Sequence, residues 1–144
     1  MIILDKNDIF GKGGLREVFL HPQDNAKIIK VSSFTDNGQN ELEVSYYEYL
    51  KKLNISSKYI SAYFGEVQTN LGHGVVFEKI TNYDNTNCLD LENFIKKKLI
   101  SRAYLNEMVD ELRDDILANN ILFYDVGLSN ILAKEYEKGR YRLV

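Results

Sequence analysis

The first half of this chain has the short alternating segments of a β-sheet, and the second half has the longer periodicity of helices. Residues 15–20 (LREVFL) and 26–31 (AKIIKV) are predicted strands, joined by a turn in which Pro22 suits the second position. Two more strands are expected at 62–69 and 75–80, around the glycine-rich turn NLGHG. Strands followed by helices predict an α+β fold, with a small sheet lobe first and a helical lobe after it.

Three helices are predicted from apolar residues that recur at helical spacing. The first runs from about 40 to 53, and its expected inward face consists of Leu42, Tyr46, Tyr49, Leu50 and Leu53. Residues 89–99 form a short amphipathic helix. A stronger one covers 103–119, and its expected inward face consists of Leu105, Met108, Val109, Leu112 and Ile116. The end of the chain is predicted to be two strands around a turn at Gly139.

Composition excludes several classes of protein. At 144 residues the chain forms one domain at most, or part of one. A net charge of -3 disfavours sequence-independent binding to nucleic acid or to an anionic membrane. The only cysteine, Cys88, has no internal partner for a disulfide. The first ten residues do not form a signal peptide, and no apolar run is long enough to span a membrane, so we expect a cytoplasmic protein.

The run GKGGLREVF (11–19) is the first candidate binding element. Gly11 and Gly13 lie between two predicted strands, where glycine lets the backbone approach a phosphate closely. The pattern resembles the nucleotide loop of protein kinases, with Val18 in the position that packs on adenine and Arg16 in place of the third glycine. A plain hairpin turn is the alternative. A dinucleotide-binding loop is disfavoured, because a strand and not a helix follows.

Lys30 is the second candidate. In a strand at 26–31, Ala26, Ile28 and Lys30 share one face, and Lys27 lies on the other. A lysine on such a face, one hairpin after a glycine loop, matches the kinase lysine that binds the α- and β-phosphates of ATP. We therefore count Ile28 and Lys30 as cofactor-binding residues. The alternative is a lysine that extends into water from the strand end, as expected for Lys27.

A kinase lysine pairs with a glutamate on the next helix. Glu41 and Glu48 belong to a polar stripe and are expected to be solvated. Glu43 borders the apolar side near Tyr47, where a carboxylate needs a cation. We therefore predict that Glu43 pairs with Lys30.

The strand at 75–80 (VVFEKI) ends in a polar segment, as the last strand of a kinase sheet does where it enters the hinge. In that layout the backbone near Glu78 and Ile80 bonds adenine, and Phe77 closes the back of the pocket. An ordinary core strand is the alternative.

Asp125 and Asn130 give the D-x-x-x-x-N spacing of a kinase catalytic loop, flanked on both sides by apolar residues. The carboxylate accepts the proton of the attacking hydroxyl, and the amide oxygen helps to hold Mg²⁺. The preceding residues, Phe123 and Tyr124, replace the usual His-Arg. Taken alone, the pair is also typical of a capped turn. The order of these kinase-like segments along the chain favours the catalytic interpretation.

Together these segments resemble the PhoP regulatory network protein family (YrbL) over essentially the whole chain. The residues that carry the resemblance are Gly11, Gly13, Arg16, Val18, Phe19, His21, Pro22, Lys30, Val31, Glu43, Tyr46, Tyr47, Leu50, the run 69–78, Asp125, Asn130, Ile131 and Leu132. The resemblance implies a protein-kinase-like fold, with a five-stranded sheet lobe and one helix at 1–80 and the start of an incomplete helical lobe at 81–144. ATP and Mg²⁺ are the implied cofactors.

The resemblance also implies a D-x-G segment after the strand at 140–144, whose aspartate binds the metal, and the sequence given ends at Val144. Three alternatives to an ATP-dependent phosphotransferase stay open. One is a pseudokinase that serves as a regulatory interaction module. Another is a kinase whose acceptor is a small molecule and not a protein. The last is an unrelated α+β domain.

Overall fold

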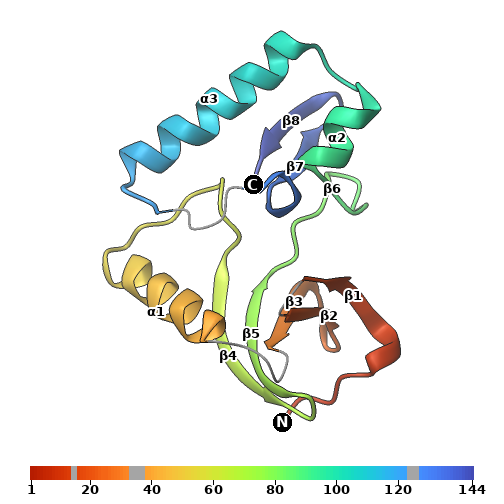
Figure 1. Cartoon of the computed structure of the whole chain (residues 1–144), viewed down its shortest axis with the longest axis vertical. Helices are drawn as coiled ribbons and strands as arrows, with labels where there is room; N and C mark the ends of the chain where they lie inside the picture. Colours follow the sequence, from red (N-terminus) through yellow and green to blue (C-terminus); the bar gives the residue numbers. More distant parts are fainter. Residues whose placement is uncertain (14–15, 33–37, 123–126) are drawn as a thin grey trace. The chain divides into compact units, whose positions relative to one another are not determined.

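The computed structural model describes residues 1–13, 16–32, 38–122 and 127–144. Its internal contacts divide the chain into two compact units. The first contains residues 1–56 and 61–79, and the second contains residues 57–60 and 80–144. The described residues form a five-stranded antiparallel sheet, a smaller sheet and three α-helices (Figure 1), which confirms the predicted α+β class.

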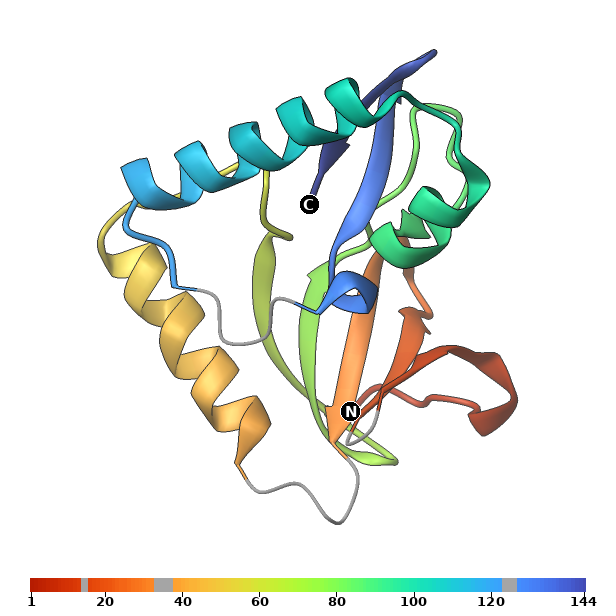
Figure 2. The ribbon, with the colours of Figure 1, turned by 45° about the horizontal axis from the view of Figure 1, so that its top comes forward.

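The first unit is built on the five-stranded sheet, in the spatial order β1-β2-β3-β5-β4 (Figure 2). A single turn of 3-10 helix, Lys6–Asp8, precedes it. The strands are β1 (Ile9–Lys12), β2 (Arg16–His21), β3 (Asp24–Ser32), β4 (Tyr63–Thr69) and β5 (Gly72–Glu78). The four strands predicted by alternation are confirmed, with ends that differ from the prediction by at most a few residues.

Alternation along the strands gives this sheet two different faces. One is apolar and packs into a core with the N-terminal segment. Its buried residues are Leu4, Phe19, Ile29, Val31 and Val76. The other face carries the predicted ligand-binding residues. Val18 lies opposite Lys30 in the β2–β3 register, and Ile28 lies opposite Phe77 in the β3–β5 register. Cross-strand partners share a face, so these four side chains lie on one side of the sheet.

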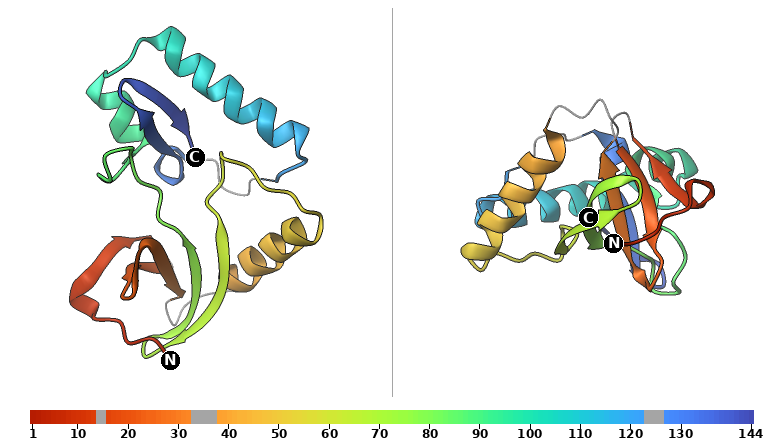
Figure 3. Two further views of the ribbon diagram at one scale, coloured as in Figure 1. Left: turned by 180° about the vertical axis from the view of Figure 1, so that it is seen from behind. Right: turned by 90° about the horizontal axis from the view of Figure 1, so that it is seen from below.

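The N-terminal segment is held beside the β4–β5 turn (Figure 3). Ile2 forms a parallel bridge with Thr69. The backbone N–H of Leu4 donates to Asn70 Oδ1 at 2.7 Å, and Asn70 Nδ2 donates to the Leu4 carbonyl at 3.0 Å. These bonds place Leu4 over the apolar face of the sheet.

Helix α1 (Gln39–Lys52) runs alongside β4 (Figure 1), and its predicted inward face is confirmed only in part. Leu50 is buried as predicted, but Leu42 is 68% exposed and Tyr49 is 54% exposed, and Asn40, which was not predicted to face inward, is buried. The helix is rotated because its polar residues Asn40 and Glu43 bind cations of the sheet, and Tyr47 packs on Phe77. Ionic and aromatic contacts therefore decide which side of α1 faces inward.

The second unit combines a three-stranded sheet with two helices. The sheet, in the order β6-β7-β8, contains β6 (Leu89–Asp90), β7 (Leu132–Glu137) and β8 (Arg140–Leu143). The helices are α2 (Leu91–Lys97) and α3 (Arg102–Ala118). Their core is formed by Tyr59, Leu91, Phe94, Met108, Leu112, Ile131, Ala133 and Leu143. The two predicted helices and the final hairpin are confirmed, although Val109 is exposed.

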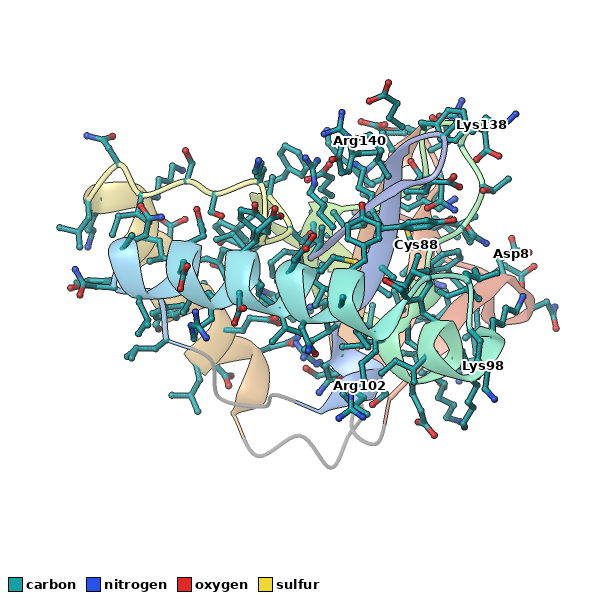
Figure 4. The ribbon with its side chains drawn as sticks, turned by 90° about the horizontal axis from the view of Figure 1, so that it is seen from above. Asp8, Cys88, Lys98, Arg102, Lys138 and Arg140 are labelled. Atoms are coloured by element: carbon teal, nitrogen blue, oxygen red, sulfur yellow. The ribbon has the colours of Figure 1, made fainter. Side chains whose placement is uncertain are left out.

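The ends of these elements are marked by polar and charged residues. Asp90 caps α2 by accepting a hydrogen bond from the Asn93 N–H, and Ser101 caps α3 in the same way. Figure 4 shows Lys98 and Arg102 near the connection between α2 and α3, and Arg140 at the β7–β8 hairpin. Within the described ranges, no helix combines the length and the apolar character needed to cross a membrane.

Gly74 tests the close packing of the first unit. A Cβ added at Gly74 would lie 2.7 Å from Ile29 Cγ2, in a core where Ile29 is fully buried. We expect Gly74→Ala to lower the free energy of unfolding by about 1–3 kcal/mol, as overpacked cores do. Urea unfolding measures the change. Gly13→Ala is the control, because a Cβ there makes only ordinary contacts; an equal loss in both variants would contradict the packing argument.

Candidate functional site

An ion pair between the sheet and helix α1 forms the centre of the candidate site. Lys30, in β3, extends from the face opposite the apolar core, and its Nζ lies 2.9 Å from Glu43 Oε1. The same ammonium lies 4.2 Å from the centroid of the Phe77 ring. The structure thus brings together Lys30 and Glu43, the two residues that the sequence pairs.

Arg16 binds the same carboxylate from the other side. Its Nη1 donates to Glu43 Oε2, and it also lies 3.4 Å from Asn40 Oδ1. Glu43 therefore accepts hydrogen bonds from two cations on two neighbouring strands. About four fifths of each of the three charged side chains is buried, so solvent screens their interaction only in part.

The arrangement shifts the pKa of both members of the Lys30–Glu43 pair. Burial alone would raise the pKa of Glu43, but the charges of Lys30 and Arg16 and their hydrogen bonds outweigh it and lower the pKa. Burial, together with repulsion by Arg16, lowers the pKa of Lys30 despite its contact with Glu43. The site holds one more positive charge than negative among its described residues.

Aromatic rings close one side of the site. Tyr47 meets Phe77 edge-on at a ring-centroid distance of 5.0 Å. The ring centroids of Tyr63 and Tyr47 lie 5.6 Å apart. Burial, reinforced by the negative charge of Glu43, raises the pKa of Tyr47 to about 12. Tyr47 therefore stays neutral at physiological pH.

The glycine loop precedes this cluster in the chain. Gly11 lies in β1 opposite Val18, and the N–H of Gly13 donates to the Arg16 carbonyl at 2.8 Å. Neither glycine has a positive φ. A Cβ at Gly11 would lie 3.8 Å from Val18 Cβ, and one at Gly13 would lie 3.6 Å from the Arg16 carbonyl oxygen. The fold of the described residues therefore does not require glycine at either position.

The predicted adenine contacts are placed less favourably for binding than Lys30 and Glu43 are. Phe77 is fully buried beside Ile28. The N–H of Glu78 already donates to the Ala62 carbonyl at 2.8 Å, and the Glu78 carbonyl accepts from Ser61 Oγ at 2.9 Å. Glu78 can therefore offer adenine only the second lone pair of its carbonyl. Ile80 belongs to the second unit.

The predicted catalytic loop lies in the second unit and is described only in part. Asp125 lies outside the described residues. Asn130 ends a 3-10 turn, Leu128–Asn130, with an exposed side chain, and Ile131 after it is buried in the core. Across the described ranges, no group of three His, Cys, Asp or Glu side chains is placed to hold a metal ion. The predicted Mg²⁺ ligand Asn130 stays a prediction.

Asn40 and the bridging role of Arg16 are absent from the prediction based on the sequence. Asn40 is 3% exposed and lies one turn before Glu43, yet an asparagine on a helix carries no distinctive pattern. A signal for Arg16 did exist, because a cation at the third position of a glycine loop needs an acidic partner nearby.

Comparison with known proteins identifies the family of the chain. A family model described as PhoP regulatory network protein YrbL matches residues 2–144. The chain belongs to this family. Two curated relatives are the YrbL proteins of Escherichia coli (strain K12) and Shigella flexneri, each 28% identical over 137 residues. The match covers 92% of this chain, which spans 65% of the length of each relative.

Glu43 should matter more for the stability of this YrbL-family chain than either cation alone. Glu43→Gln leaves two cations without a counter-charge, and we expect it to lower the free energy of unfolding by about 1–3 kcal/mol at pH 7. Lys30→Met keeps the Arg16–Glu43 contact and should lower the free energy of unfolding by less. Equal losses in the two variants, measured by urea unfolding, would contradict a carboxylate at the centre of the site.

The effect of Glu43→Gln should also depend on pH. The folded-state pKa of Glu43 lies below its ordinary value of 4.5, so its charge stabilises the fold fully above that value. This contribution is lost as the pH falls through the folded-state pKa. The difference in unfolding free energy between the wild type and Glu43→Gln should therefore shrink as the pH falls below about 4.5, and a difference that grows there would contradict the assignment.

Proposed function

We propose that this member of the YrbL family is a protein-kinase-like ATP-binding domain that transfers phosphate from ATP in the cytoplasm. The observation that carries the proposal is the Lys30–Glu43 ion pair between β3 and α1. In protein kinases a lysine of the third strand binds the α- and β-phosphates and pairs with a glutamate of the following helix. The corresponding two elements supply the pair in this chain.

Under this proposal each described residue has a defined task. The ammonium of Lys30 binds the α- and β-phosphates, and Glu43 holds that ammonium in place. The adenine packs on Val18 and Ile28, on the same face of the sheet as Lys30. Phe77 closes the pocket behind them.

The glycine loop supports the proposal independently of the ion pair. Gly72 and Gly139 have positive φ, and Gly74 has no room for a side chain, so the fold accounts for these three glycines. Gly11 and Gly13 have neither reason. A backbone without side chains at these two positions leaves space for a ligand to approach the N–H groups closely.

The chemical step is assigned to the loop of the second unit. Asp125 accepts the proton of the attacking hydroxyl, whether a protein or a small molecule supplies it. Asn130 would hold Mg²⁺, which neutralises phosphate charge when bound. A protein that binds ATP and transfers no phosphate would instead be a regulatory module of the pseudokinase type.

Two lysines of one strand provide a matched test of ATP binding. Lys30→Met should weaken ATP binding by about tenfold or more, since a hydrogen bond to a charged group contributes about 1.5–3 kcal/mol. Lys27→Met removes a cation from the opposite face of β3, where Lys27 pairs with Asp24 at 2.9 Å. Titration calorimetry should show ATP affinity unchanged in this control. Equal affinity in the wild type and Lys30→Met would end the proposal.

In a protein extended to include the implied D-x-G segment, Asp125→Asn separates binding from chemistry. We expect ATP binding to be retained and phosphate release to fall by about 10²–10⁴-fold, the usual contribution of a general base. Radiolabelled phosphate release and ATP titration on the same sample measure both quantities. Normal turnover in this variant would show that Asp125 is not the base.

A further inference from the structure

Arg16 and Lys30 lie on one face of the sheet as diagonal neighbours. Arg16 is opposite Ser32 in the β2–β3 register, and Val18 is opposite Lys30. Residues two apart along a strand point to the same side, so Arg16, Lys30 and Ser32 share the face that α1 covers. The first turn of α1 adds Asn40 to this group. Three elements therefore bring hydrogen-bond donors to one place.

The charges of this group do not balance. Arg16 and Lys30 contribute two positive charges, and Glu43 is the one carboxylate of the described residues within ion-pair distance of them. All three side chains are largely buried, where an uncompensated charge is costly. A bound anion would balance the charge.

The donors also outnumber the acceptors. Asn40 Nδ2 and Ser32 Oγ are buried and have no hydrogen-bond partner in the described part of the chain. Arg16 uses only Nη1 for Glu43 and Asn40, so Nε and Nη2 make no hydrogen bond to the described residues. A buried donor without an acceptor costs about 1–3 kcal/mol, so Asn40 Nδ2 and Ser32 Oγ indicate a missing acceptor.

The N-terminus of α1 also favours an anion. The N-cap residue Gly38 makes no side-chain capping bond, so among the described residues no N-cap side chain accepts from the first-turn N–H groups of this 14-residue helix. The helix dipole places partial positive charge there, which favours an anion. This feature adds to the buried Nδ2 of Asn40 in the same first turn, which has no hydrogen-bond partner among the described residues.

We infer that Arg16, Lys30 and Asn40 form a phosphate subsite in which Arg16 is a direct ligand of the terminal phosphate groups. The planar guanidinium binds two phosphate oxygens through the N–H groups that Glu43 leaves free. The Nδ2 of Asn40 donates to a third oxygen. The assignment of this phosphate to a nucleotide rests on the proposed function; the subsite itself rests on the charges and donors described above.

The test compares three ligands that share parts of ATP. Tripolyphosphate carries the phosphates alone, adenosine carries the base and sugar alone, and ATP carries both. Calorimetry at one ionic strength measures their affinities for the wild type, for Arg16→Gln and for the control Lys27→Gln. We expect Arg16→Gln to weaken both ATP and tripolyphosphate by about tenfold while adenosine is unaffected. Lys27→Gln should bind all three ligands as the wild type does.

Asn40→Asp provides a second test that does not depend on the folding of Arg16→Gln. The new carboxylate supplies the missing anion beside Arg16, so we expect the melting temperature to rise. Tripolyphosphate affinity should fall at least tenfold, because the subsite is already neutralised and repels the ligand. A variant that binds tripolyphosphate as tightly as the wild type would overturn the subsite.

The outcomes separate the subsite from the nucleotide function. If ATP binds the wild type and Arg16→Gln equally well, the function stands and the role of Arg16 is overturned. If tripolyphosphate binding depends on Arg16 but ATP binds no tighter than tripolyphosphate, the subsite is supported and the nucleotide function fails. A wild type that binds neither ligand overturns both. An equal loss for adenosine and ATP would show that Arg16 is only structural, which also overturns the subsite.

Discussion

The arrangement of the first unit depends on the ion pairs that the carboxylate of Glu43 forms. It joins helix α1 to two strands at once, through Lys30 and Arg16, in a place that is largely closed to water. A buried ion pair seldom stabilises a fold more than well-packed apolar side chains would. We therefore propose that the three charges serve to bind a ligand more than to stabilise the fold. The rotation of α1 follows, because Glu43 and Asn40 must face the sheet.

The sequence predicts the sheet well and the helix orientation poorly. Alternation located β2 to β5, and the predicted helix 40–53 differs from α1 by one residue at each end. The inward face of α1 was predicted from leucine and tyrosine spacing, a rule that assumes an apolar partner surface. The partner surface here carries two cations and a phenylalanine. The two-residue strand β6 is too short for any pattern to predict it.

The candidate site was also predicted only in part. Lys30 and Glu43 belong to a spacing that a glycine loop, a strand and a helix make recognisable before any coordinates are known. Asn40 is recognisable only once α1 is rotated correctly, because nothing in its neighbours distinguishes it from an exposed asparagine. The relation of Asp125 to Lys30 stays a prediction, since Asp125 lies outside the described residues.

The position of the charged residues is set from the other side of the sheet. Phe19 lies opposite Ile29 in the β2–β3 register, and Ile29 lies opposite Val76 in the β3–β5 register. A slip of one residue would move these side chains from the core to the charged face, so the apolar core fixes the register. The same register fixes Val18 opposite Lys30, and with it the diagonal spacing of Arg16 and Lys30. The buried apolar residues thus position the residues that are proposed to bind phosphate.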